Sequence, residues 1–244
     1  MKTVHMVLQG KGGVGKSLVS SLLCQYLEKQ EQVIAIDTDP VNNTLAGYKA
    51  LAASRLDIRA GDTIDPRKFD PLMEIILRGE EQDDNHHIVI DNGASTFLPL
   101  CSYLSENQIM PLLRDAGVRV LLHTVFTGGQ AMGDTADGME ALAVTFPDEQ
   151  LVVWVNRYFG EITRNGKKFE EFSIYKKYLD KFHSLIRLPL KNVQTFGRDL
   201  EELFTRRQTF ADALADDSLT IMTRQRLKIW WNEMSTELDR AQLI

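Results

Sequence analysis

The residues with the clearest capacity for chemistry form one short stretch near the start of the chain. Gly10, Gly15, Lys16 and Ser17 satisfy the spacing G-x-x-x-x-G-K-[ST] between an apolar run at residues 3–8 and a helical pattern. The glycines let successive backbone N–H groups converge on the oxygens of a polyphosphate at the N-terminus of the helix. In such a loop the lysine meets the β- and γ-phosphates, and the serine ligates Mg²⁺. The spacing therefore predicts a site for a nucleoside triphosphate and Mg²⁺.

The same glycines allow a second interpretation. They also read as G-x-G-x-x-G, the dinucleotide fingerprint, with Asp37 about 20 residues further on. A dinucleotide loop bridges a pyrophosphate and does not need a Lys-Ser pair at its end. Lys16 and Ser17 therefore favour the nucleoside triphosphate.

Polar side chains end three of the predicted strands. Asp91 stands where a carboxylate reaches Mg²⁺, usually through water. Asp37 and Asp39 follow another strand. In this position Asp39 could orient the attacking water, and Asp37 could hold the metal shell or the loop. The alternative is that the pair only forms a tight Asp-Pro turn. Asn156 ends a third strand, a position where asparagine is also common in turns. In parallel sheets ligands gather at these strand ends, so we expect the four side chains to surround the nucleotide.

The elements that must position these residues are predicted by alternating patterns. Short β-branched runs alternate with longer amphipathic ones, and the apolar continuity of the short runs implies strands buried on both faces. This order predicts an α/β protein with a three-layer P-loop NTPase fold, in which helices flank a mainly parallel central sheet. The strands are expected at residues 3–8, 32–36, 87–90, 118–125, 151–155 and 184–188, the helices at 17–30, 66–77, 107–116, 130–146 and 169–181, and loops at 79–85 and 164–168.

Composition fits one domain of ordinary size. The chain has 244 residues, 43% hydrophobic and 25% charged, which is enough for a sizeable core, so we expect a single domain over residues 1–244 with C-terminal helices at about 196–240 packing on it.

Cys24 and Cys101 lack metal-ligand spacing, and His86 and His87 are expected to be loop histidines rather than metal ligands. The start of the chain lacks a secretory pattern and no apolar run approaches 18 residues, so a cytoplasmic protein is expected. The net charge of -6 argues against bulk nucleic-acid binding.

These residues resemble the deviant-Walker ATPases, the family that includes the plasmid-partition protein ParA and the division-site protein MinD. Residues 11–17 match the loop K-G-G-x-G-K-[ST] of that family, and residues 37–43 match its segment D-x-D-P-x-x-N. The resemblance implies ATP and Mg²⁺ as cofactors and a homodimer in the ATP state. It also implies that Lys11 crosses the dimer interface to the partner's nucleotide.

The resemblance further implies a role for each site residue. Asp39 would activate water, Asp91 would contact the metal, and Asn156 would recognise adenine. The catalytic residues expected on this basis are Lys11, Lys16 and Asp39, and the expected metal residues are Ser17, Asp37 and Asp91. Nucleotide contacts are expected from Gly10, Lys11, Gly12, Gly13, Val14, Gly15, Lys16, Ser17, Leu18 and Asn156.

Within that family the chain is similar to a group of conjugal-transfer proteins encoded by transmissible plasmids. The likeness rests on residues 5–9, 91–95, 127–130 and 214–228. It implies a slow ATPase that supports plasmid transfer, with an unidentified component of the conjugation machinery as its partner. The chain departs from the partition pattern after Asp91, where Asn92 and Gly93 replace the usual proline-containing segment, so Gly93 is either a conformational sensor or a plain turn.

The C-terminal segment leaves two alternatives open. Apolar residues recur near helical spacing between Leu219 and Leu238, which fits either a membrane-associated helix or a helix docked on the sheet; nearby acids would oppose an anionic bilayer and favour docking. Basic residues at Arg206, Arg207 and 224–228 fit either nonspecific binding of plasmid DNA, as in a partition ATPase, or a solvated face. A scaffold that binds nucleotide without turnover is the remaining alternative.

Overall fold

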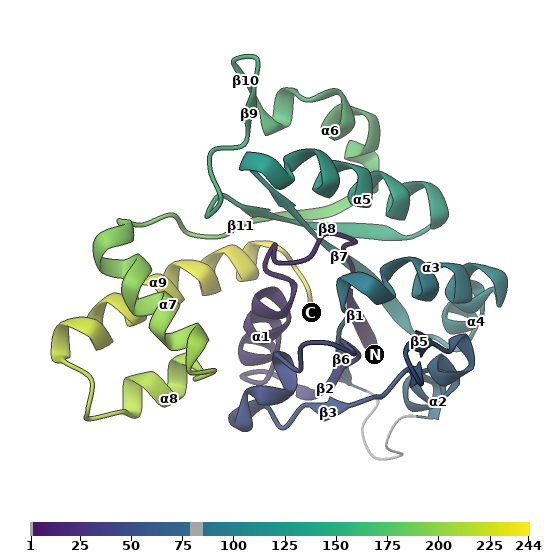
Figure 1. The fold of residues 1–244 in the computed structure, drawn as a ribbon, viewed down its shortest axis with the longest axis horizontal. Coiled ribbons are helices and arrows are strands. Elements are labelled where there is room, and N and C mark those ends of the chain that lie inside the picture. The colour runs from purple at the N-terminus through teal and green to yellow at the C-terminus, as the bar shows by residue number, and fades with distance from the viewer. Residues whose placement is uncertain (1, 79–84) are drawn as a thin grey trace.

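A seven-stranded parallel sheet forms the centre of the molecule in a computed structural model that describes residues 2–78 and 85–244 (Figure 1). The strands lie in the order β11–β8–β7–β1–β6–β2–β3, and every neighbouring pair is parallel. Their bounds are β1 Thr3–Val7, β2 Gln32–Asp37, β3 Ser54–Arg55, β6 His86–Asp91, β7 Arg119–Thr127, β8 Gln150–Asn156 and β11 Phe182–Arg187. The predicted parallel α/β sheet is confirmed.

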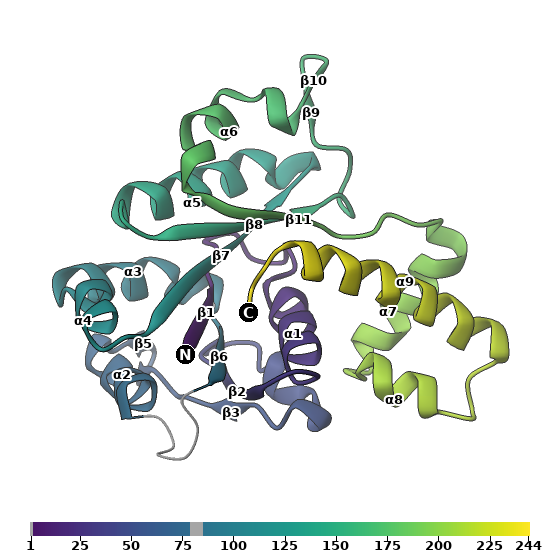
Figure 2. The same cartoon turned by 180° about the vertical axis from the view of Figure 1, so that it is seen from behind.

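Helices cover both faces of this sheet, as Figures 1 and 2 show from opposite sides. One buried core includes Met6 and Ile90 together with side chains of α2 to α6, and the other includes Val7 and Val89 together with side chains of α1 and α7 to α9. Alternate residues of a strand face opposite sides, so the six strands other than the exposed β3 contribute to both cores. The helices are α1 Lys16–Leu27, α2 Asp70–Arg78, α3 Phe97–Glu106, α4 Ile109–Asp115, α5 Met132–Thr145, α6 Ser173–Tyr178, α7 Arg198–Thr205, α8 Phe210–Ala215 and α9 Ile221–Arg240.

Some elements differ from the sequence-based expectation. Helix α3 was not predicted; Pro99 lies in its first turn, where a missing N–H breaks no helical hydrogen bond. Residues 164–168, expected to be a loop, form part of the hairpin of β9 Thr163–Arg164 and β10 Lys167–Lys168, whose turn residues Asn165 and Gly166 have φ of 53° and 74°. Two positive φ values match the twist of a two-residue hairpin turn. A second hairpin, β4 Arg59–Ala60 and β5 Thr63–Ile64, was also not predicted, and residues 79–84 of the predicted loop at 79–85 lie outside the described residues.

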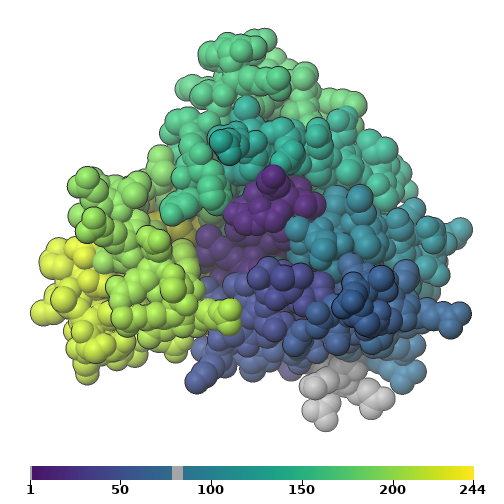
Figure 3. All heavy atoms as spheres, viewed as in Figure 1, coloured from purple at the N-terminus to yellow at the C-terminus, as the bar shows by residue number. Residues whose placement is uncertain are grey.

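The last three helices form a lobe beside α1 and the β2–β3 segment, seen in yellow-green in Figure 3. Helix α9 buries Leu227, Trp230, Trp231, Met234 and Leu238. The ring of Phe210 in α8 stacks on both tryptophans, with centroids 5.3 Å from Trp230 and 4.8 Å from Trp231. These five residues of α9 therefore pack inside the protein, whereas Ile221 and Met222 in its first turn are exposed. Within the described parts of the chain, no helix is long and apolar enough to cross a bilayer.

Candidate nucleotide-binding site

The loop between β1 and α1 has the conformation that its glycines were expected to allow. Gly13 and Gly15 have φ of 73° and 104°, a region that other residues rarely adopt. Helix α1 begins at Lys16, so its first N–H groups face the loop. The Lys16 ammonium donates a hydrogen bond to the backbone oxygen of Lys11 at 3.0 Å and so spans the loop. Burial lowers the pKa of Lys16, whereas the nearby carboxylates of Asp91 and Asp39 raise it.

A buried glutamine anchors the entrance of this loop, and sequence reasoning did not find it. The Gln9 amide nitrogen lies 3.2 Å from Thr124 Oγ1, 3.0 Å from the Val125 oxygen and 3.1 Å from the Thr135 oxygen. Its amide oxygen accepts from Lys11 N at 3.4 Å. Gly138 of α5 leaves the space that Gln9 occupies, because a β-carbon there would overlap Gln9 Oε1. The loop is thus attached to β7 and α5 through one side chain.

The carboxylates at the ends of β2 and β6 meet as predicted. Val7 pairs with Asp91, and Asp91 pairs with Asp37, in the register of the three central strands. Ser20 Oγ donates to Asp91 Oδ1 at 3.0 Å, while the buried Oδ2 has no hydrogen bond of normal geometry within the described residues. Burial raises the pKa of Asp91 to about 7, which the Ser17 hydroxyl opposes and the charge of Asp37 increases.

This arrangement fits Mg²⁺. The ion prefers hard oxygen ligands, and it is usually held by one or two carboxylates, a hydroxyl, water and substrate phosphates rather than by a cage of protein groups. The Ser17 hydroxyl and the unpaired Asp91 oxygen supply such ligands beside the phosphate loop. Among the described residues no group of three or more His, Cys, Asp or Glu side chains is arranged to hold a metal. Ser17 and Asp91 are therefore the residues that would hold the ion.

Asp37 is occupied by its own loop. Its Oδ1 accepts from Asp39 N at 3.0 Å, and its Oδ2 accepts from Ala46 N at 3.0 Å. Burial raises the pKa of Asp37, and these two N–H groups oppose that effect. Of the two roles considered for Asp37, the hydrogen bonds favour holding the loop over direct contact with a metal.

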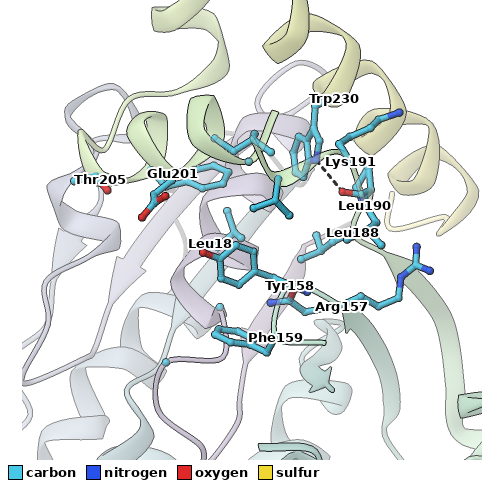
Figure 4. A pocket seen from close by; sticks show the side chains of 18 residues that line it. Leu18, Arg157, Tyr158, Phe159, Leu188, Leu190, Lys191, Glu201, Thr205 and Trp230 are labelled. Atoms are coloured by element: carbon cyan, nitrogen blue, oxygen red, sulfur yellow. Dashed lines mark hydrogen bonds between the residues drawn. The ribbon is translucent and has the colours of Figure 1, made fainter. Parts of the chain in front are cut away.

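Asn156 braces the phosphate loop at the mouth of a cavity. Its amide donates to the Val14 oxygen at 3.0 Å, and its Oδ1 accepts from Tyr158 N at 3.0 Å. The adjoining cavity measures about 430 Å³ and is mainly apolar; Leu18, Tyr158 and Trp230 contribute to its wall (Figure 4). Leu18 comes from α1 just after the phosphate loop, so the cavity offers space for the base of a nucleotide whose phosphates lie on the loop.

Comparison with known proteins identifies the family. A profile of the CobQ/CobB/MinD/ParA nucleotide binding domain matches residues 5–214. The chain belongs to this family. Two Escherichia coli proteins, each called Protein TraL, are 49% and 47% identical to this chain over 246 residues, and the matches cover 100% of this chain and of each relative. The sequence resemblances stated above are thereby confirmed.

Solved structures of the MinD/ParA family share the fold. The MinD cell division protein of Aquifex aeolicus has a TM-score of 0.53 at 16% identity and covers 96% of this chain and 97% of its own. A putative plasmid partition protein of Borrelia burgdorferi bound to AMPPNP has a TM-score of 0.54 at 16% identity, with 98% of both chains covered. At this identity the likeness concerns the fold alone.

Lys11, the lysine expected to cross a dimer interface, pairs with a residue of its own chain. Lys11 Nζ lies 2.7 Å from Asp134 Oδ2, in the first turn of α5, and the two side chains are 43% and 55% exposed. An ion pair this exposed is weak, with a typical strength of about 0.2–1 kcal/mol. Lys11 is therefore held loosely and is available for other partners.

The segment that departs from the partition pattern ties two loops together. Asn92 Oδ1 accepts from Thr96 Oγ1 at 2.6 Å and from Thr38 Oγ1 at 3.1 Å. Gly93 has an ordinary φ of -66°, but a β-carbon there would lie 2.8 Å from the Asp39 carboxyl. A glycine is needed at position 93 because Asp39 approaches so closely, not because the turn needs a left-handed residue.

The basic residues considered for DNA binding are mostly paired within the C-terminal lobe. Arg206 pairs with Glu202, Arg224 Nη1 lies 2.9 Å from Asp217 Oδ1, and Arg226 Nε lies 2.5 Å from Asp199 Oδ2. Such pairs reduce the positive charge available to a phosphate backbone. These contacts favour the solvated-face interpretation.

A second buried polar cluster lies within the sheet, away from the phosphate loop. His5 Nδ1 lies 3.0 Å from His123 Nε2, and His5 Nε2 lies 3.0 Å from His87 Nδ1. Trp154 Nε1 donates to His123 Nδ1 at 2.9 Å, and His87 Nε2 lies 3.1 Å from Glu31 Oε2. The prediction that His86 and His87 are loop histidines is wrong, because both lie buried in β6.

Because the Trp154 indole can only donate, it sets the tautomers of this histidine chain. His123 must accept at Nδ1 and therefore carries its proton on Nε2, which makes His5 an acceptor at Nδ1 and a donor at Nε2 toward His87. Each ring is then neutral with its proton on Nε2. The cluster has no position for an additional proton unless one of its hydrogen bonds breaks.

Proposed function

We propose that the chain is a Mg²⁺-dependent ATP-binding switch that hydrolyses ATP slowly, forms a homodimer in the ATP state and supports conjugal plasmid transfer. The transfer role rests on the full-length match, at 49% and 47% identity, to proteins called TraL, and the ATP role rests on the phosphate loop. The observation that carries the proposal is the buried, unpaired Asp91 oxygen beside Lys16 at the end of β6.

Each site residue has a task in this proposal. Lys16 would exchange its bond to the Lys11 oxygen for the β- and γ-phosphates, whose charge offsets the burial that lowers the pKa of Lys16. Mg²⁺, when bound, neutralises developing charge on the phosphates. Asp39, held by its loop at the end of β2, would orient the attacking water. Asp37 would keep that loop in place rather than bind the ion.

In the proposed dimer, each copy supplies the other with a cation that accelerates hydrolysis. Phosphate-loop switches hydrolyse at about 10⁻⁴ per second alone and roughly 10³- to 10⁵-fold faster when a cation arrives in trans. We propose Lys11 of a second copy as this cation, because its ion pair with Asp134 is exposed and weak. Adenine would occupy the cavity beside Asn156, with its apolar wall against the base.

The proposal is tested by measuring binding, assembly and turnover on the same samples. ATP affinity with and without Mg²⁺ should fall at least about tenfold in Lys16→Ala, and Asp91→Ala should remove the Mg²⁺ dependence. Light scattering should detect a wild-type dimer with ATP and a wild-type monomer with ADP. Lys11→Ala should remain a monomer with either nucleotide. Absence of ATP binding by the wild type would contradict the proposal.

Turnover separates the switch from the scaffold alternative. Single-turnover hydrolysis should be measurable in the wild type and lost in Asp39→Ala, while ATP binding persists in both. If the wild type binds ATP but its hydrolysis equals that of Asp39→Ala, the chain is a nucleotide-binding scaffold. A salt-sensitive, ATP-dependent gel shift with plasmid DNA would instead support the partition-type alternative.

A further inference from the structure

An arginine of the C-terminal lobe lies on the backbone of the loop that carries Asp39. A β-carbon at Gly47 would lie less than 3.0 Å from Nη1, Cδ and Cζ of Arg207. Gly47 itself has no left-handed φ, so its backbone would accept alanine. A side chain at position 47 would therefore have to displace the end of the Arg207 side chain.

Arg207 also has an unusual backbone. Its φ is 52°, directly after the end of α7, where glycine or asparagine is usual. A left-handed conformation costs a residue with a β-carbon roughly 1–2 kcal/mol. Its N–H donates to the Phe204 oxygen at 3.1 Å, and the Gln208 N–H donates to the Leu203 oxygen at 3.1 Å, so this turn is well ordered. The turn aims the Arg207 side chain away from its own helix and toward the β2 loop.

The lobe that carries Arg207 is attached to the other side of the nucleotide site. Trp230 Nε1 donates to the Pro189 oxygen at 3.0 Å, the bond drawn as a dashed line in Figure 4. Lys191 Nζ lies 2.5 Å from Glu233 Oε1, and Arg187 N donates to Glu237 at 3.3 Å. The lobe thus holds the segment after β11, which borders the cavity, as well as contacting Gly47 after β2.

Gly47 in turn lies at the far end of a loop that Asp37 closes. The Asp37 carboxylate accepts from Asp39 N at one end of the loop and from Ala46 N at the other, each at 3.0 Å. Gly47 follows Ala46 and donates to the Thr44 oxygen at 3.2 Å. A continuous set of contacts therefore joins Arg207 to Asp39 through Gly47, Ala46 and Asp37.

We infer that Arg207 is a positioning residue, which braces the loop of residues 39–47 against the C-terminal lobe and so sets the place of Asp39. This inference rests on the proposed function, in which Asp39 orients water. It also makes the lobe a control element: a partner that displaced α7 and α8 would move Arg207 and alter hydrolysis without touching the nucleotide.

The test compares Arg207→Ala with its neighbour Arg206→Ala. Arg206 pairs with Glu202 on its own helix, so its loss removes a charge of the same kind from the same turn without reaching the loop. Arg207→Ala should slow single-turnover ATP hydrolysis roughly tenfold, since displacement by about 1 Å is costly to a positioned group, and leave the ATP Kd within about twofold. Arg206→Ala should change neither quantity. Arg207→Lys, which keeps the stem and the charge, should recover part of the rate.

Gly47→Ala supplies an independent route to the same result. Its β-carbon would displace the guanidinium, so it should slow hydrolysis as Arg207→Ala does, and the double variant should be no slower than either single variant. If the two losses multiply, the residues do not act through one contact. Equal loss of hydrolysis in Arg206→Ala and Arg207→Ala would also overturn the inference.

Hydrogen exchange separates this inference from the proposed function. The amides of Ala46 and Gly47 should exchange faster in Arg207→Ala than in the wild type, whether or not the protein hydrolyses ATP. If the wild type shows no hydrolysis, the proposed turnover is wrong. Exchange at these two amides would still show whether Arg207 holds the loop of residues 39–47 in place. Unchanged exchange at both amides, with only the melting temperature lowered, would show that Arg207 serves stability alone.

Discussion

The Asp39 carboxyl lies against Gly93, so closely that a β-carbon on the glycine would stand 2.8 Å from the Cγ and Oδ1 atoms of Asp39. Asp39 Oδ1 also accepts from Val41 N at 2.9 Å and Asn42 N at 3.1 Å, which fixes the carboxyl from the other side. The loops after β2 and β6 therefore meet at these two residues. A shift of either loop would therefore displace the other.

Gly93→Ala should displace Asp39 without disturbing nucleotide binding. The φ of Gly93 suits alanine, so only the lack of space opposes the substitution. We expect single-turnover hydrolysis to fall about 10- to 100-fold and the ATP Kd to change little, because a small misplacement of a positioned group affects the reaction more than binding. Ser95→Ala, an exposed residue of the same loop, is the matched control. Normal hydrolysis by Gly93→Ala would show that the rate does not depend on the present position of the Asp39 carboxyl.

Asp134→Asn should release Lys11 and favour the ATP-bound dimer. The substitution removes the charge that holds Lys11 Nζ at 2.7 Å in the free chain. An exposed pair contributes about 0.2–1 kcal/mol and each dimer would release two of them, so the dimer dissociation constant should fall by roughly 2- to 30-fold at low salt. The difference should shrink as salt is added.

The control for this variant is Asp137→Asn, another exposed carboxylate of α5 with no ion pair among the described residues. Sedimentation at several protein concentrations, with ATP present, provides the measurement. Weaker dimerisation of Asp134→Asn than of Asp137→Asn would mean that Asp134 supports the interface instead of competing with it.

Local patterns predicted most of the sheet and most of the candidate site, whereas the contacts that hold the site were not predictable from them. The phosphate loop is a local motif, and Asp37 and Asp91 follow buried apolar runs, so their meeting follows from parallel strands. Gln9 and Gly138 carry no periodic signal, because their relationship exists only once α5 packs beside the segment that follows β1. The ion pair of Lys11 with Asp134 likewise joins distant parts of the chain through tertiary packing.

The buried histidine chain should make stability depend on pH below about 6.5. Burial lowers the pKa of His5, of His87 and, to about 3, of His123. These groups are neutral in the folded state but gain protons in the unfolded chain below its pKa of about 6.5, so their stabilisation is complete above that pH and declines as the pH falls toward the folded values. For a histidine with a folded pKa near 3, the loss between pH 6.5 and 5 is about 2 kcal/mol.

His123→Gln should reduce this pH dependence. In urea unfolding between pH 7.5 and 5, the slope of stability against pH should fall below that of the wild type by an amount that approaches one proton, or about 1.4 kcal/mol per pH unit, toward pH 5, even though the variant is less stable at pH 7.5. Asp91 has the opposite slope, because its raised pKa favours the folded state as the pH falls, so only the difference between variants is informative. Equal slopes for the wild type and His123→Gln would exclude the histidine chain as the cause.

Gly138→Ala should disturb the phosphate loop through Gln9, which packs against this face of α5. A β-carbon there would overlap Gln9 Oε1, the atom that accepts from Lys11 N. Overpacking of this kind costs about 1–3 kcal/mol of folding free energy, and displacement of Gln9 should weaken ATP binding as well. Gly133→Ala in the same helix, where the added carbon meets open space, should instead stabilise the protein by about 0.5–1 kcal/mol. Gln9→Ala removes the clash, so in that background Gly138→Ala should lose most of its effect on both quantities; an undiminished effect would show that Gly138 acts through some contact other than Gln9.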